Sequence, residues 1–348
     1  MPFIESSTGH APFSPSRRRL ALGLPLAAAG LWLIPQVSRA ANTVRQGRTI
    51  MGTAVDIHVN HRDTALAQQA AKAAFDEMQR LEQMMSRYVP GNTLSALHAS
   101  AGIQAIPIPA EMSSVLQAGQ AVAAASQGAF NMSIGALQDW DFRVGHYHAA
   151  SAQAIHAQLP LVRADGLVLD AARHTAMLRY QGMRLDLGGI AKLPILQAGM
   201  HTLQSHGITS AMVNGGGDVL LAGGNQGAPW RIGIRDPLRP AGILGTVALH
   251  EGVVASSGDY ERCFEQDGQR FHHVIDPHTG YPSTGPHGVV LVSRDIGAVN
   301  GWGAATMVAG AAFGRERILA ATDIRGLIVD RDRSSWVSPG MHSLLQKA

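Results

Sequence analysis

The chain has 348 residues, with 28 Lys or Arg and 25 Asp or Glu. Four of the arginines and one glutamate fall in the first 40 residues, which leaves 24 residues of each sign in the remainder. The basic excess therefore belongs to the N-terminal segment, which argues against a nucleic-acid partner. Cys263 is the only cysteine, which excludes an intrachain disulfide and a thiolate metal cluster.

The first 40 residues are predicted to be a twin-arginine signal peptide. Three arginines at 17–19 precede an uncharged run at 20–34, which is too short to span a bilayer comfortably. Residues 38–40 resemble a small-residue cleavage site. Such signals carry folded proteins across a bacterial inner membrane. We therefore expect residues 41–348 to form the mature periplasmic protein, without a stable transmembrane segment after cleavage.

The mature chain is predicted to mix helices and strands. Alternation at 55–59 indicates a strand, and apolar residues at three- and four-residue steps from Ala67 to Met85 indicate an amphipathic helix. Further helices are expected at 110–126, which Gly128 ends, at 190–205 and at 298–312. The other β-prone runs predict strands at 167–169, 176–180, 184–187, 211–213, 230–234, 245–249, 289–292 and 326–329. This mixture predicts an α+β fold over a regular βαβ repeat.

Paired glycines stand where a predicted strand leads into a predicted helix. Gly188 and Gly189 follow Asp186 and precede Lys192. Glycines let a backbone approach a ligand closely, and amides at a helix start attract phosphate. Lys192 would add a positive charge, and Asp186 would bind a hydroxyl group or orient the lysine. A tight turn without any ligand explains the paired glycines equally well.

A second glycine cluster precedes Asp218. Gly215, Gly216 and Gly217 lie between two apolar runs. Thin backbone of this kind suits contact with a flat ring or a phosphate, but a hairpin turn is the favoured interpretation.

The densest polar run covers residues 255–260 and 271–280. In a strand, His272 and His273 point to opposite sides, so at most one of them readily joins a given site. Turn formation and surface exposure would also explain these residues. An exported histidine-metal hydrolase that uses His272, His273 and His278 remains an alternative.

Taken together, these segments resemble the FAD:protein FMN transferases, also called the ApbE family. The segments that carry the resemblance occur in the family's order and span most of the mature chain. They are Met51–Thr53, Ser86–Tyr88 with Pro90, Gly128–Phe130 leading to Trp140 and Phe142, Asp186–Lys192, Gly215–Asp218, Trp230–Pro237, Ser256–Tyr260 and His272–Gly280.

The resemblance implies a fold of mixed sheets and helices with a flavin cleft between two lobes. Members of the family bind FAD with a divalent cation, usually magnesium. They move the FMN half onto a Ser or Thr hydroxyl of an acceptor protein and release AMP. For this chain the acceptor is expected to be a periplasmic or membrane-bound respiratory protein.

The resemblance also implies roles for individual residues. His273 is the expected base or orienting group, Lys192 is the second catalytic residue, and Asp276 and Thr279 shape the histidine loop. The expected flavin-binding residues are Met51, Ser86, Tyr88, Asp186, Gly188, Gly189, Gly216, Asp218, Ser257, Gly258, Asp276 and Thr279. The expected metal ligands are the Ala191 carbonyl and Asn300.

The chain departs from the family pattern at the metal site. Asn300 stands at the position of a metal-binding Asp, and Ala304 at that of a metal-binding Thr. A neutral amide oxygen binds magnesium more weakly than a carboxylate. Thr306 would replace the lost hydroxyl only if the helix register shifted by two residues, which is a rotation of about 200°.

Other departures are Thr93 for an expected Glu, Asn131 for an expected Asp, and Leu193-Pro194 for the Gly-Tyr after the lysine. Two main hypotheses follow. The chain is an FMN transferase, or it is a non-catalytic periplasmic flavin-binding accessory protein in respiratory enzyme maturation. Its twin-arginine signal is similar to that of diverged members that serve nitrous oxide reductase maturation.

Overall fold

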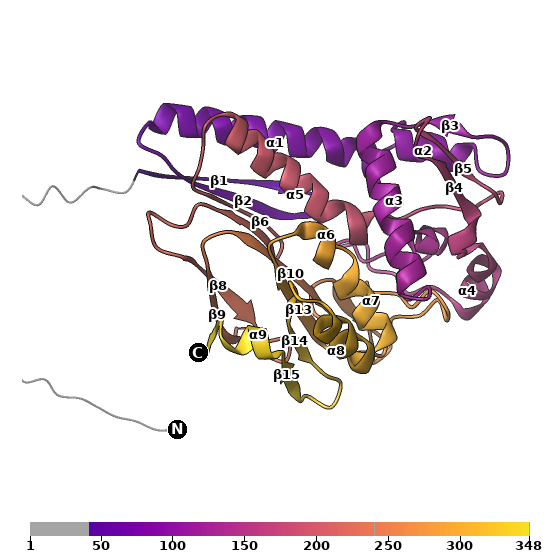
Figure 1. Cartoon of the computed structure of the whole chain (residues 1–348). Helices are drawn as coiled ribbons and strands as arrows, with labels where there is room; N and C mark the ends of the chain where they lie inside the picture. The colour runs from indigo at the N-terminus through magenta and orange to yellow at the C-terminus, as the bar shows by residue number, and fades with distance from the viewer. Residues whose placement is uncertain (1–41, 240, 348) are drawn as a thin grey trace, which may run out of the picture. The chain divides into compact units, whose positions relative to one another are not determined.

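A central antiparallel sheet organises the described part of the chain, which comprises residues 42–239 and 241–347 of the computed structural model (Figure 1). Its eight strands follow the order β1-β2-β6-β7-β10-β13-β14-β15, and all neighbouring pairs are antiparallel. Three smaller sheets are β3-β5-β4, β16-β9-β8 and β11-β12. The strands are β1 (Thr43–Ile50), β2 (Thr53–Asn60), β3 (Ile106–Pro107), β4 (Leu167–Asp170), β5 (Thr175–Leu178), β6 (Ala211–Gly215), β7 (Asp218–Ala222), β8 (Trp230–Arg235), β9 (Ile243–Leu249), β10 (Gly252–Gly258), β11 (Cys263–Gln266), β12 (Gln269–His272), β13 (Gly288–Ser293), β14 (Arg325–Val329), β15 (Ser335–Val337) and β16 (Leu345–Lys347).

The helices are of very different lengths. They are α1 (Thr64–Met85), α2 (Thr93–Ala99), α3 (Ala110–Ala125), α4 (Ala152–Gln158), α5 (Gly188–Ser205), α6 (Ile296–Val299), α7 (Trp302–Ala309), α8 (Ala311–Ala320) and α9 (Pro339–His342), with short 3₁₀ turns η1 (Met132–Ala136), η2 (Leu159–Leu161) and η3 (Ala164–Gly166). No helix among the described residues is both long and apolar enough to cross a membrane. The predicted signal peptide lies outside the described residues.

The core occupies both faces of the central sheet. Helices α1 and α5 pack together over β1, β2 and β6, while α7 and α8 lie against β10, β13 and β14 (Figure 1). Strands β8 and β9 and helix α9 contribute Trp230, Val247 and Met341 to a second apolar cluster on the opposite face. Because both faces are covered, every residue of β13 is buried, which explains its continuous apolar sequence.

The side chain of Asp63 accepts hydrogen bonds from the backbone N–H groups of Ala65 and Leu66 and so caps α1.

A small residue sets the contact between the two long helices. A Cβ atom added to Gly199 of α5 would lie 2.8 Å from the sulfur of Met78. The glycine therefore lets α5 approach α1 closely.

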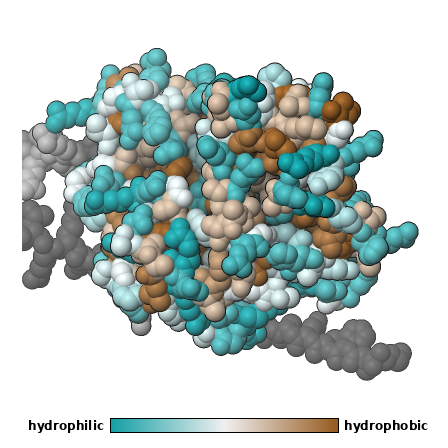
Figure 2. All heavy atoms as spheres, turned by 45° about the vertical axis from the view of Figure 1, so that its right-hand side comes forward, coloured by the Kyte–Doolittle hydropathy of each residue, from teal (hydrophilic) through white to brown (hydrophobic). Residues whose placement is uncertain are grey.

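Figure 2 shows that polar side chains interrupt the apolar patches on one face of the molecule.

The predicted α+β class is confirmed, and most elements lie where the sequence places them. The buried stripe of α1 contains Ala67, Ala70 and Met78, in agreement with the predicted periodicity. The predicted hairpin at the second glycine cluster is also correct, because Gly216 and Gly217 connect β6 to β7 with φ of 63° and 96°. L-residues rarely adopt this conformation.

Two predicted elements are wrong. Residues 184–187 form no strand, because their backbone groups bond elsewhere: Asp186 N donates to the Met132 carbonyl and Leu185 N donates to His98 Nε2. The single helix predicted at 298–312 is three short helices, since Gly301 and Gly310 have φ of 79° and 98°. Positive φ at these two glycines interrupts the helical path.

Candidate functional site

The start of α5 presents a half-buried ion pair. Arg87 Nη1 lies 2.9 Å from Asp186 Oδ2, and Gly188 N donates to Asp186 Oδ1 at 2.8 Å. Burial alone would raise the pKa of Asp186, but the Arg87 guanidinium and the Gly188 amide hold that pKa below its usual range. No side chain caps α5, whose N-cap is Leu187. The helix start therefore combines polar backbone with a fixed carboxylate.

Lys192 is oriented by Asp218 and not by Asp186. Its Nζ atom lies 2.7 Å from Asp218 Oδ2, and the Asp218 side chain is only 8% exposed. The second carboxylate oxygen accepts from Ser256 N at 2.9 Å. The predicted alternative in which Asp186 orients the lysine is wrong, because Asp186 is bonded to Arg87. The turn into β7 thus fixes the lysine through a buried carboxylate.

Arg262 links the β1–β2 turn to the same region. Its Nη2 atom donates to the Met51 carbonyl at 3.0 Å, and Met51 N donates to Glu82 Oε1 at 2.7 Å. Met51 has φ of 57°, an uncommon conformation for a residue with a side chain. Arg262 also contributes to the electrostatic environment of Asp186 and His273. Arg262 and the β1–β2 turn at Met51 therefore hold each other in position.

The adjacent histidines have different surroundings. His272 is buried, and its Nε2 atom is 3.0 Å from the Ser283 carbonyl. Burial, with the nearby Arg262, His272 and Lys192, lowers the pKa of His273 to about 3. Its Nδ1 atom is buried without a hydrogen-bond partner in the described part of the chain. His273 is thus a neutral imidazole beside two cationic side chains.

Asp276 and Thr279 make hydrogen bonds within the loop after His273. Asp276 Oδ1 accepts from His278 N at 2.8 Å, and Thr279 Oγ1 accepts from Tyr281 N at 3.3 Å. Trp140 Nε1 donates to the Gly280 carbonyl at 2.9 Å. The aromatic cluster that contains Trp140 therefore supports the histidine loop.

The remaining predicted flavin-binding residues are distributed around these elements. Ser86 caps the C-terminal end of α1, and its hydroxyl oxygen accepts from Tyr88 N. Tyr88 is 55% exposed. A Cβ atom on Gly216 would overlap Thr53, and one on Gly189 would lie 3.1 Å from the Phe130 ring. Packing alone therefore accounts for the glycine at these two positions.

The end of β10 lies against the start of α7. A Cβ atom on Gly303 would overlap the hydroxyl of Ser257, and one on Gly258 would overlap the Tyr260 ring. The Gly303–Ser257 contact shows that the end of β10 and the start of α7 approach each other closely.

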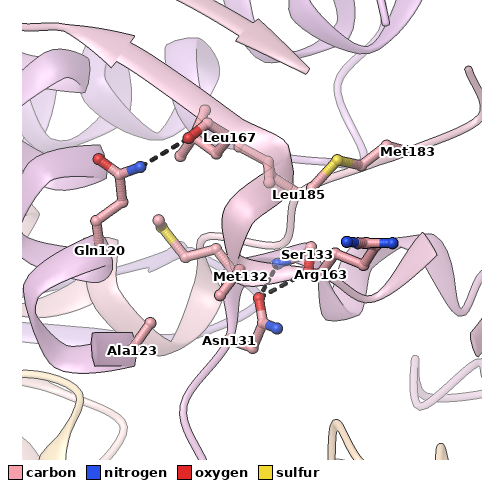
Figure 3. A pocket seen from close by; sticks show the side chains of 10 residues that line it. Gln120, Ala123, Asn131, Met132, Ser133, Arg163, Leu167, Met183 and Leu185 are labelled. Atoms are coloured by element: carbon pink, nitrogen blue, oxygen red, sulfur yellow. Dashed lines mark hydrogen bonds between the residues drawn. The ribbon is translucent and has the colours of Figure 1, made fainter. Parts of the chain in front are cut away.

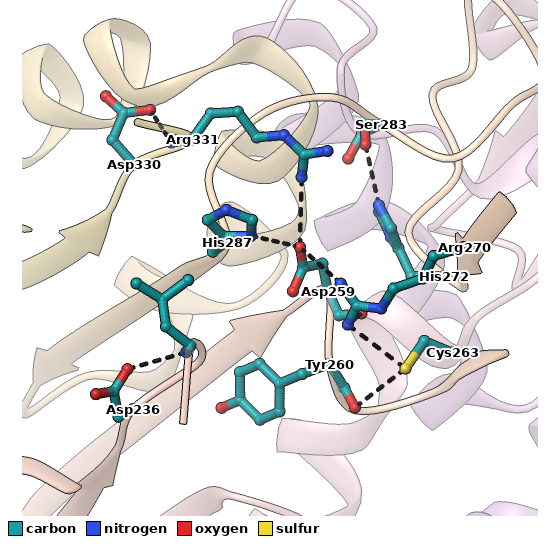
Figure 4. Close-up of polar contacts among 11 residues, drawn as sticks. Asp236, Asp259, Tyr260, Cys263, Arg270, His272, Ser283, His287, Asp330 and Arg331 are labelled. Atoms are coloured by element: carbon teal, nitrogen blue, oxygen red, sulfur yellow. Dashed lines mark hydrogen bonds and ion pairs between the residues drawn. The ribbon is translucent and has the colours of Figure 1, made fainter. Parts of the chain in front are cut away.

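Asp259, which follows Gly258 at the end of β10, is buried and pairs with side chains from neighbouring strands. Figure 4 shows its carboxylate among His287, Arg270 and Arg331. The Asp259 Oδ2 atom is 2.7 Å from His287 Nδ1 and 3.5 Å from each guanidinium. The Asp259 side chain is 2% exposed. The cluster ties the ends of β10, β12, β13 and β14 together.

A polar cavity of about 170 Å³ lies beside Asp186. Its lining includes Arg87, Tyr88, His98, Arg143 and Arg184. Burial, with the neighbouring Arg184 and Arg87, lowers the pKa of His98 to about 4. Asp141 also lines the cavity and pairs with Arg143, while Arg87 pairs with Asp186. Arg184 and the neutral imidazole of His98 therefore remain on the wall for a polar or anionic ligand group.

Asn131, which replaces an expected Asp, has a local structural role. Its Oδ1 atom accepts from the backbone N and the hydroxyl of Ser133, as Figure 3 shows. The adjacent interior space is about 10 Å³, roughly the room for one water molecule. Asn131 therefore caps η1.

Asn300, an expected magnesium ligand, is bonded to the backbone of α5. Asn300 Nδ2 donates to the Ile190 carbonyl at 2.8 Å, and Ala304 offers no side-chain oxygen. Ala191 is buried in the first turns of α5. Within residues 42–239 and 241–347 no group of three or more His, Cys, Asp and Glu side chains is arranged to hold a metal. The same finding gives no support to a metal site of His272, His273 and His278.

Sequence reasoning missed three residues of this region, namely Arg87, Arg262 and His98. Arg87 lies inside the Ser86–Tyr88 motif, where its positive charge was the available signal. Arg262 lies between two motifs, and only the folded chain brings it to the Met51 turn. The available signal for Arg262 was a positively charged residue between the two polar runs.

Comparison with known proteins identifies the class. Residues 51–328 match the ApbE family. The chain is 29% identical over 293 residues to an FAD:protein FMN transferase of Klebsiella pneumoniae, covering 83% of this chain and 90% of that protein. It is 32% identical over 256 residues to an FAD:protein FMN transferase of Treponema pallidum, covering 67% and 69%.

The fold agrees with this similarity. The crystal structure of the ApbE protein of Thermotoga maritima superposes with a TM-score of 0.79 at 27% identity, covering 88% of this chain and 100% of that one. The described fold is thus that of an ApbE protein. The chain belongs to the ApbE family.

Proposed function

We propose that this protein is an FAD:protein FMN transferase. The observation that carries the proposal is the convergence of Lys192, Arg262 and the Arg87–Asp186 pair with His273, which retains an unpartnered buried Nδ1 atom within the described residues. At the start of α5 the Gly188 amide donates to Asp186, which leaves the Gly189 amide as a group of the kind that binds phosphate. A dinucleotide pyrophosphate requires such fixed positive charge, and an acceptor hydroxyl requires a base.

In the proposed reaction, neutral His273 accepts the proton of a Ser or Thr hydroxyl of the acceptor protein. The hydroxyl oxygen then forms a bond to the FMN phosphorus of FAD, the bond to the bridging pyrophosphate oxygen breaks, and AMP leaves. Lys192 and Arg262 stabilise the negative charge on the phosphate oxygens. Bound phosphates near His273 raise its low pKa toward neutrality, which makes it a better base.

A resident magnesium ion does not fit the residues that the family pattern assigns to it. Hard cations favour carboxylate oxygens, whereas Asn300 directs its N–H group at the Ile190 carbonyl. No step of the proposed reaction therefore passes through a metal. The supporting charge comes from the side chains of the protein.

The transfer experiment uses purified protein, FAD and a flavin-acceptor protein with an accessible Ser or Thr. The expected result is a covalently fluorescent acceptor band with stoichiometric release of AMP. Tight FAD binding without label or AMP would instead favour the flavin-binding accessory protein. Absence of both binding and label would exclude both functions.

We further propose periplasmic action after twin-arginine export, on a respiratory membrane-bound or periplasmic acceptor. The arginines at 17–19 and the apolar run that follows support this location. Replacing Arg17 and Arg18 by Lys is expected to retain the protein in the cytoplasmic fraction. Unchanged periplasmic recovery of the double variant would contradict the proposed route.

A further inference from the structure

A proline inside α5 leaves one buried carbonyl without its helical donor. Pro194 is the seventh residue of α5, and proline has no backbone N–H. The group that loses its partner is the carbonyl of Ile190, four residues earlier. Ile190 is fully buried, so water does not replace the missing donor. A buried carbonyl without a partner is costly.

Asn300 supplies the missing donor. Its Nδ2 atom lies 2.8 Å from the Ile190 oxygen, and its side chain is buried. The backbone N of Asn300 donates to the Ile296 carbonyl and ends α6. A Cβ atom on the following residue, Gly301, would lie 3.1 Å from Ile190 Cδ1. This glycine therefore allows the close approach that places the amide against α5.

The two departures from the family pattern explain each other. Pro194 creates the need for a donor, and only the amide at position 300 meets it. An ionised Asp there has no N–H and would bring a negative charge against the carbonyl oxygen. The hydroxyl-bearing Thr306 does not compensate, because its side chain packs toward Gly314 of α8.

We infer that the Asn300–Ile190 hydrogen bond, required by Pro194, has replaced a divalent-cation site, so that the protein binds FAD without magnesium. The inference rests on the proposed function for its ligand. Fixed positive charge remains available at Lys192, held by Asp218, and at Arg262. Side-chain cations with rigid partners bind phosphate oxygens without an added ion.

The first test measures FAD affinity by flavin fluorescence in excess EDTA and in excess MgCl₂. We expect the two dissociation constants to agree within about twofold, and a loss of about tenfold or more in EDTA would overturn the inference. Binding of Mn²⁺, followed by electron paramagnetic resonance without flavin, is expected to be undetectable, and stoichiometric binding would also overturn it. Absence of FAD binding in both buffers would contradict the proposed function, while the Mn²⁺ measurement would still decide the metal question.

The second test is a double-mutant cycle on the melting temperature. Asn300→Ala leaves the Ile190 carbonyl unpartnered and is expected to lower the melting temperature by a few degrees. In the Pro194→Ala background the backbone N–H restored at position 194 takes over that carbonyl, so the same Asn300→Ala change should cost clearly less. The cycle cancels the side-chain truncation itself. Equal losses in both backgrounds would refute the coupling.

Discussion

Acidification tests the half-buried imidazole of His98, which lines the cavity beside Asp186. Burial and the neighbouring Arg184 and Arg87 lower the pKa of His98 to about 4 from an ordinary value of 6.5. Its Nε2 atom accepts a hydrogen bond from Leu185 N at 2.9 Å, so protonation removes an acceptor and also adds a half-buried charge. At a pH above the pKa of the unfolded chain, His98 is neutral in both the folded and the unfolded state, and no stability is lost. As the pH falls below 6.5, the unfolded chain binds a proton that the folded chain does not, and stability decreases.

The size of this effect follows from the two pKa values. Between about pH 7.5 and about pH 4.5, one histidine with this shift lowers the free energy of unfolding by about 2.5 kcal/mol. His98→Gln removes the titrating group and keeps an acceptor near the Nε2 position. The variant should therefore lose about 2.5 kcal/mol less than the wild type over the same interval, although His273 destabilises both proteins at low pH.

Chemical denaturation at the two pH values, followed by tryptophan fluorescence, measures the difference. His156→Gln is a matched control, since His156 is exposed on α4, and it should follow the wild type. If His98→Gln loses as much stability on acidification as the wild type does, the half-buried neutral imidazole is not a source of acid sensitivity.

Three further predictions concern the site and the backbone. His273→Ala should lower the rate of FMN transfer by roughly 10²- to 10⁴-fold while FAD still binds; equal transfer by the variant in a single-turnover assay would remove His273 as the base. Lys192→Met should weaken FAD binding by roughly 10- to 100-fold in a fluorescence titration, because a charge-assisted contact is lost, and an unchanged affinity would place the phosphates elsewhere. Gly223→Ala should destabilise the fold severely, because φ is 66° and the new Cβ would overlap the Thr209 carbonyl. Gly207→Ala, where φ is 81° and the surrounding space is open, should lower the free energy of unfolding by only about 1–2 kcal/mol. Equal shifts of the melting temperature for the two variants would contradict the steric argument.

Local signals in the sequence were sufficient for most elements. The spacing of Ala70, Ala74 and Met78 on α1 depends only on which face of a helix is apolar. The turn at Gly216 depends on a backbone conformation that glycine adopts readily. The order of the motifs was sufficient to indicate the family, which the match over residues 51–328 confirms.

Local signals failed where backbone groups find distant partners. Residues 184–187 have the composition of a strand, but Asp186 N bonds to the carbonyl of Met132. The apolar run after residue 298 has helical composition, but Gly301 and Gly310 interrupt it. Composition reports how well a segment suits an element, and tertiary contacts decide which conformation it adopts.

What the sequence alone determined is the inventory of chemical groups: a histidine loop, a lysine after paired glycines, and the loss of a carboxylate at Asn300. Only the tertiary structure decided their pairing. It paired Lys192 with Asp218 and Asp186 with Arg87, and it directed the Asn300 amide to the carbonyl that Pro194 frees. The physical reason is that hydrogen bonds and ion pairs act over about 3 Å, so partners far apart in the chain are determined by packing and not by sequence spacing.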